Sequence, residues 1–163
     1  MSKTTYYSIY DNQYHILYGA CGDDNIYLKK EDAEDAALAM MIHDALKNGA
    51  DRNEVEAKYR GMNPGKAIRN SNYEVCRVYR RYRVHAPNAG SAYEPKKFEH
   101  RKNAAEYVRK EIIAAHLQRL LDRKRFASLN GEYEKLNRIP AEKLAHDEGY
   151  RIDLCYETRG PKY

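Results

Sequence analysis

The chain has 163 residues and contains no Trp, only two Phe and only three Cys. The cysteines, Cys21, Cys76 and Cys155, are far apart and form no Cys-x-x-Cys pair. An odd number of isolated cysteines argues against a disulfide framework and against a zinc knuckle. The six histidines have no metal-ligand spacing either. We therefore expect neither a bound metal nor another cofactor.

Long apolar runs are absent as well. No stretch approaches the roughly 20 apolar residues that a membrane-spanning helix needs. The first residues, MSKTTYYSIYDN, lack the apolar core of a signal peptide. These absences favour a cytoplasmic protein with no membrane partner, in the cytoplasm of a host if the source is a virus.

Tyrosine and positive charge are what the chain has in excess. Sixteen Tyr replace the missing Trp and Phe, and a ring with a polar tip suits half-exposed sheets and binding faces. The net charge is +5, but residues 73–126 hold fourteen Lys/Arg against six Asp/Glu, an excess of eight positive charges. A basic segment of this kind is a candidate contact surface for a polyanion.

The periodicity of the apolar residues predicts an α+β fold, with an antiparallel, Tyr-rich sheet and helices packed on one of its faces. Strands are expected at residues 4–10 and 14–20, which form a hairpin, and at 73–85 and 150–157. Helices are expected at 31–48, 52–60 and 102–126, with one or two short helices, broken at Pro140, at 131–146. A single domain is expected over 1–163, in which the basic segment 73–126 precedes C-terminal helices and a closing strand at 127–163.

The segment 61–72, GMNPGKAIRNSN, superficially resembles a phosphate-binding loop. It has three residues between its glycines where that motif needs four, and Ala67 follows the lysine where Ser or Thr is needed. Its two Gly and one Pro instead predict a surface loop.

The predicted strand 73–85 reads YEVCRVYRRYRVH. Strand periodicity places Cys76, Val78, Tyr82 and Val84 toward a core, and most of the arginines on the opposite face. Arg80 breaks the pattern, because its parity points inward. We expect the strand to bulge or end at Arg80, or Arg80 to have an acidic partner.

The order of elements over residues 14–126 is a strand, a helix, a short helix, one or two strands and a long helix, which resembles a KH RNA-binding domain. In that family a Gly-x-x-Gly loop joins the first two helices and clamps the nucleic-acid backbone. The junction here reads Lys47-Asn48-Gly49-Ala50-Asp51, with one glycine. The resemblance implies an RNA-binding fold, and the missing second glycine predicts no KH-type clamp.

The sequence thus favours non-enzymatic binding of nucleic acid, with single-stranded RNA ahead of duplex, because Arg and Lys neutralise phosphates while Tyr stacks on unpaired bases. We assign no catalytic residue. The stacking candidates are Tyr79 and, with its inward parity, Tyr82. The candidates for phosphate contact are Arg77, Arg81, Arg83, Lys96, Lys97, Arg101 and Lys102.

Three alternatives stay open at this point. The basic face can be a solvated surface whose arginines pair with acidic side chains. It can also belong to a viral or accessory interaction module that binds an acidic partner protein, since Tyr and Arg dominate interface hot spots. A small ribonuclease would use His85 and His100 as a general acid and base. Unpaired strand edges would also permit a homodimer.

Overall fold

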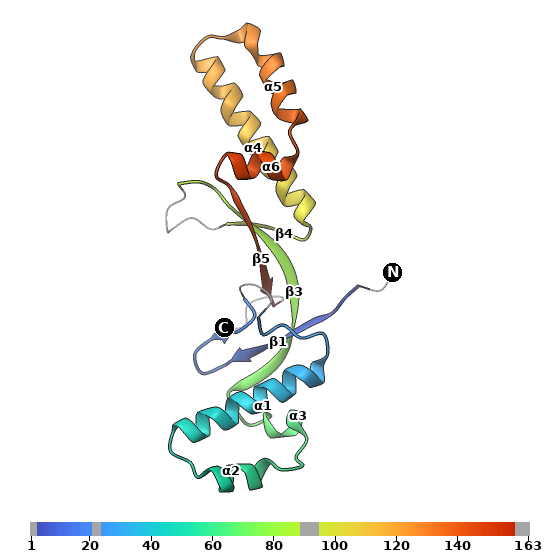
Figure 1. Ribbon diagram of the computed structural model, residues 1–163, viewed down its shortest axis with the longest axis vertical. Helices are drawn as coiled ribbons and strands as arrows, with labels where there is room; N and C mark the ends of the chain where they lie inside the picture. Colours follow the sequence, from blue (N-terminus) through green and yellow to red (C-terminus); the bar gives the residue numbers. More distant parts are fainter. Residues whose placement is uncertain (1–2, 21–23, 89–94, 159–163) are drawn as a thin grey trace. The chain divides into compact units, whose positions relative to one another are not determined.

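The computed structural model describes residues 3–20, 24–88 and 95–158 (Figure 1). The helices are α1 Lys30–Lys47, α2 Arg52–Tyr59, α3 Pro64–Ala67, α4 Arg101–Asp122, α5 Leu129–Arg138 and α6 Ala141–Asp147, with a 3-10 helix, η1, at Phe126–Ser128. The strands are β1 Tyr6–Asp11, β2 Ile16–Leu17, β3 Tyr73–His85, β4 Lys96–Phe98 and β5 Arg151–Glu157. The predicted α+β class is confirmed. Cys21 lies outside the described residues.

The strands form an antiparallel sheet in the order β2-β1-β3-β4, and β5 also pairs with β3. The predicted N-terminal hairpin is present, with Tyr10 opposite Leu17. β3 has the bounds that the sequence predicts and continues through Arg80 to His85. Among the described residues, no helix combines the length and the apolar character needed to cross a bilayer.

The chain divides into two compact units. Unit 1 comprises residues 1–80 and 155–163, and unit 2 comprises residues 81–154, so β3 and β5 each contribute to both. The single domain over 1–163 stays a prediction. The helices compared with a KH domain belong to separate units, because α1 and α2 are in unit 1 and α4 is in unit 2.

The core of unit 1 forms where α1 covers the paired strands β1 and β3. Ile9 and Tyr73 from the strands are buried with Ala37 from α1 and with Ile68. Tyr73 shares the parity of Arg77 and Arg83, which we predicted on the face opposite the core. It is buried instead, because Val75 and Tyr73 lie on the face that α1 packs against.

The segment 61–72 is not wholly a loop, since it contains α3. Asn63 accepts a hydrogen bond from the Lys66 amide at 3.2 Å, and Pro64 occupies the first turn of the helix. Both are helix-starting features, because the capping side chain satisfies a free amide and proline has no amide to satisfy. The loop prediction was therefore wrong at residues 64–67.

The core of unit 2 is built on α4, which packs against α5 and α6. The apolar stripe of this helix is buried from Ala104 to Ile113. It ends before the helix does, since Leu121 is 40% exposed. Val84 of β3 joins the same core, as its parity predicted.

Candidate nucleic-acid interface

Arg77 and Tyr79 lie next to each other on one face of β3, within unit 1. The Arg77 guanidinium is 5.3 Å from the centroid of the Tyr79 ring. Arg77 is exposed and Tyr79 is half-buried. The ring that we predicted to stack on a base is therefore in a cation–π contact with a neighbouring arginine.

Arg80, whose strand parity points inward, contacts two tyrosine side chains. Its guanidinium lies 4.8 Å from the ring centroid of Tyr6, and its Nε and Nη2 donate hydrogen bonds to the Tyr156 hydroxyl at 3.2 and 3.1 Å. Tyr156 is 2% exposed. The strand does not end at this position, because aromatic rings and a phenol oxygen accommodate the half-buried guanidinium.

Three arginines that we predicted to contact phosphate make ion pairs within unit 2. Arg81 Nη2 is 3.7 Å from Glu99 Oε1. Arg83 holds Asp153 through two hydrogen bonds, at 2.9 and 3.3 Å. Arg101 holds Glu142 in the same way, at 2.7 and 3.1 Å. These positions fit the alternative of a basic face paired with acidic side chains.

The other predicted residues of unit 2 differ in exposure. The Lys96 ammonium lies 4.5 Å from the ring centroid of Tyr107, and Lys97 and Lys102 are exposed. Tyr82 packs against the core of unit 2 and lies opposite Phe98 on β4. Tyr82 is thus oriented as its inward parity predicted.

The two histidines of the ribonuclease alternative have different surroundings. His85 Nε2 lies 3.0 Å from Oδ2 of Asp153, and Arg83 contacts the same carboxylate. His100 is the exposed residue before α4 and makes no capping hydrogen bond through its side chain. No group of three His, Cys, Asp or Glu within the described ranges is placed to bind a metal.

A second basic cluster, which the sequence analysis did not select, lies where α4 leads into α5. We call it the α4 tip. It consists of the cations Arg119, Arg123, Lys124 and Arg125 and the rings Phe126 and Tyr133. All four cations are exposed, and the structure gives them no ion pair in the described part of the chain. Phe126 is 61% and Tyr133 is 47% exposed.

The backbone at the α4 tip is unusual. Three helices end in the same motif, in which two amides after the helix bond back to carbonyls of its last turn and one residue has positive φ. That residue is Gly49 after α1 and Gly149 after α6, whereas after α4 it is Lys124, with φ 57°. The α4 hydrogen bonds run from Lys124 N to Leu121 O at 3.0 Å and from Arg125 N to Leu120 O at 2.9 Å.

Side-chain contacts fix the helices that carry the tip. His116 of α4 lies between Glu132 and Glu148, with its ring nitrogens 3.2 and 3.0 Å from their carboxylate oxygens. Arg109 donates to the backbone oxygen of Asn137 at 2.7 Å. Both contacts hold α5 against α4, so Tyr133 projects from a fixed helix.

The charge of the protein is concentrated in the same unit. Residues 81–154 contain sixteen Lys/Arg and eleven Asp/Glu, whereas the rest of the chain contains thirteen of each. Unit 2 therefore carries a net charge equal to that of the whole chain. Because several acids of unit 2 are used in ion pairs, the unpaired excess is exposed at positions such as the α4 tip.

The sequence signal for the tip was the run Arg123-Lys124-Arg125-Phe126 directly after an apolar helix stripe. The helix dipole, which favours positive charge at a helix C-terminus, would by itself explain the cations of this run. That explanation does not account for the exposed ring or for a lysine at positive φ.

No known protein family, curated protein or solved structure matches this chain.

Proposed function

We propose that the protein is a non-enzymatic nucleic-acid-binding protein that binds single-stranded RNA through the α4 tip. The observation that supports this most strongly is Lys124. A lysine at positive φ costs about 1–2 kcal/mol relative to an ordinary backbone conformation, a cost that glycine avoids. Strained residues of this kind tend to occur at binding sites, where the side chain is needed. Here the side chain adds a cation between Arg123 and Arg125.

The rings of the tip favour single strands over duplexes. Unpaired bases can stack on exposed aromatic side chains, whereas the bases of a duplex are already stacked on one another. Phe126, which directly follows the cations in the sequence, and Tyr133 on α5 are both exposed. Cations for the phosphates and rings for the bases are the two components of a sequence-tolerant single-strand site.

Lys96, Lys97 and Lys102 offer a second contact for the same strand. They precede or begin α4, and the tip follows its last residue. A helix of 22 residues is about 33 Å long at a rise of about 1.5 Å per residue. We propose that a single strand long enough to cover α4 contacts both ends.

A titration of the full chain with fluorescent single-stranded RNA, single-stranded DNA and duplex RNA of equal length tests the proposal. We expect the tightest binding to single-stranded RNA. Phe126→Ala and Tyr133→Ala should each weaken it by about 1–3 kcal/mol. Tyr14→Ala is the matched control, since Tyr14 is an exposed ring of unit 1.

Absence of binding to every oligonucleotide at low salt would overturn the proposal. Binding to an acidic protein from nuclease-treated lysate, lost with the tip cations, would then support the interaction-module alternative. Cleavage of the RNA that stops in a His85→Ala or His100→Ala variant would support the ribonuclease alternative and contradict the non-enzymatic assignment.

A further inference from the structure

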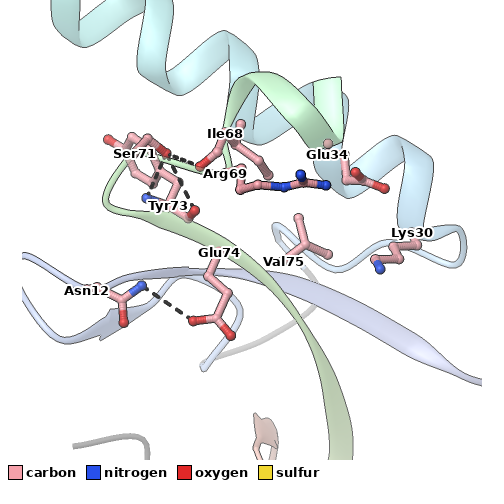
Figure 2. Close-up of a pocket in the computed structure, with 10 residues that line it drawn as sticks. Asn12, Lys30, Glu34, Ile68, Arg69, Ser71, Tyr73, Glu74 and Val75 are labelled. Atoms are coloured by element: carbon pink, nitrogen blue, oxygen red, sulfur yellow. Dashed lines mark hydrogen bonds between the residues drawn. The ribbon is translucent and has the colours of Figure 1, made fainter. Parts of the chain in front are cut away.

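Unit 1 contains a cavity of about 320 Å³ between the start of α1, the α3 segment and the start of β3 (Figure 2). It lies outside the nucleic-acid site proposed above, since all of its lining residues belong to unit 1. Ligand pockets for small molecules begin at about 300 Å³. The volume therefore suits a small ligand.

Four charged side chains of both signs line this cavity. Lys30 and Glu34 come from α1, Arg69 from the segment after α3, and Glu74 from β3. In Figure 2, the Arg69 side chain extends toward Glu34, with Lys30 nearby, and Glu74 lies on the opposite side with Asn12. Asn12 Nδ2 is 3.4 Å from Glu74 Oε2. The structure gives Lys30, Glu34 and Arg69 no ion pair in the described ranges.

The wall between these charged groups is held by its own hydrogen bonds. The Ser71 hydroxyl donates to the Ile68 carbonyl at 2.7 Å and accepts from the Tyr73 amide at 3.1 Å. The Tyr73 hydroxyl donates to Asp44. A tyrosine phenol is protonated at neutral pH, and burial, with the neighbouring Asp44 carboxylate, raises the pKa of Tyr73 further. A fixed wall lowers the entropy lost when a ligand binds.

Gly65 sets the position of one carboxylate. A Cβ atom at residue 65 would overlap the Glu34 carboxylate, so the side chain of Glu34 lies directly against the backbone of α3. The missing side chain leaves Glu34 room to face the cavity. Any larger residue at position 65 would have to displace that carboxylate.

We propose that this cavity binds a small zwitterion, a free amino acid or a dipeptide. Its carboxylate would bind Lys30 and Arg69, and its ammonium group would bind Glu74 on the opposite side of the cavity, while Glu34 adds negative charge to the lining. Arginine suits the first role because its planar guanidinium can bond both oxygens of a carboxylate. A simple anion would be repelled by the two glutamates, and a simple cation by Lys30 and Arg69.

The test uses isothermal titration of the full chain with each of the twenty amino acids and with glycylglycine. Amide-shift mapping by NMR locates the site. We expect at least one zwitterion to bind and to shift amides in residues 30–34 and 69–75. The N-acetyl and the C-amide derivatives of that ligand should each bind at least about tenfold more weakly, which corresponds to a loss of at least about 1.4 kcal/mol.

Variants separate the two poles of the site. Arg69→Gln should weaken the zwitterion about tenfold, and Gly65→Ala should weaken it by displacing Glu34 while leaving both cations in place. Lys66→Gln is the control, since Lys66 is an exposed cation of α3 that does not line the cavity. RNA binding should be unchanged in all three variants, which separates this proposal from the preceding one.

Two results would overturn the proposal. One is the absence of binding or amide shifts with every amino acid and glycylglycine at millimolar concentration. The other is equal binding of the N-acetyl derivative, of inorganic phosphate or of a mononucleotide, which would show that the glutamates do not select the ligand.

Discussion

Arg83 on β3 donates two hydrogen bonds to the carboxylate of Asp153 on β5, with Nε–Oδ1 and Nη2–Oδ2 distances of 2.9 and 3.3 Å. Both side chains are less than a third exposed, at 24% and 29%. A two-pronged guanidinium–carboxylate contact of this kind is stronger and more directional than an ordinary surface ion pair. Arg83 therefore stabilises unit 2, and the cations that bind a polyanion are better sought elsewhere.

Removing the Arg83 guanidinium should cost stability and leave RNA binding almost unchanged. Arg83→Gln leaves a half-buried carboxylate with fewer partners, so the free energy of unfolding should fall by about 1–2 kcal/mol. Urea denaturation measures this change. The control is Arg151→Gln, which affects the same carboxylate from a side chain that is 70% exposed and 3.7 Å away. It should change the free energy by less than about 0.5 kcal/mol. Equal effects of the two variants would contradict a specific role for Arg83.

Replacing Lys124 by glycine should stabilise the protein and weaken its binding to RNA. Glycine removes a strain of about 1–2 kcal/mol at positive φ. Its greater conformational entropy in the unfolded chain reduces this gain in stability by up to about 1 kcal/mol. We therefore expect a net gain of about 0.5–1 kcal/mol in urea denaturation. Lys110→Gly, at an exposed position within α4, should instead lose about 1 kcal/mol. A Lys124→Gly variant that binds RNA as tightly as the wild type would remove the main support for the α4 tip.

The Tyr73 phenol should make unit 1 less stable in strong alkali. Burial raises its pKa in the folded protein above the ordinary value of about 10. Above that pH the unfolded chain loses the proton while the folded chain keeps it. The stabilisation is thus complete below pH 10 and falls as pH rises beyond it, by at most about 1.4 kcal/mol per pH unit.

Denaturation at several pH values tests this prediction. Tyr73→Phe should reduce the slope above pH 10. It should not abolish the slope, because burial, with Asp11 nearby, also raises the pKa of Tyr18. Tyr14→Phe should leave the slope as in the wild type, since Tyr14 is 66% exposed. An unchanged slope in Tyr73→Phe would contradict the raised pKa.

Local periodicity was sufficient to predict most elements of the fold. β3 has its predicted bounds, and Val78 and Val84 are buried as their parity indicated. The burial of Tyr73 could not be predicted in this way, because parity does not say which face of a strand a distant helix will cover. α4 ends at Asp122 rather than at residue 126, because Lys124 adopts positive φ, which sequence propensity assigns to glycine.

The candidate site was harder to predict, because charge pairing depends on tertiary structure. The partners of Arg83 and Arg101 are 70 and 41 residues away in the chain, so no local pattern reveals them. The basic segment 73–126 includes the four tip cations, but composition alone could not separate them from the paired arginines. Exposure and backbone geometry provide that distinction.

The salt dependence of RNA binding tests the α4 tip most directly. The tip variant carries Gln at positions 119, 123, 124 and 125. A control variant carries Gln in place of four exposed lysines of unit 1, Lys29, Lys47, Lys58 and Lys66, and has the same net charge.

The logarithm of the binding constant should fall linearly with the logarithm of salt concentration, with a slope of about 0.7 per phosphate contacted on a single strand. For the tip variant we predict a slope shallower than that of the wild type by up to about 3, and for the control an unchanged slope. Equal slopes for the wild type and the tip variant, or a loss confined to the control, would contradict the account.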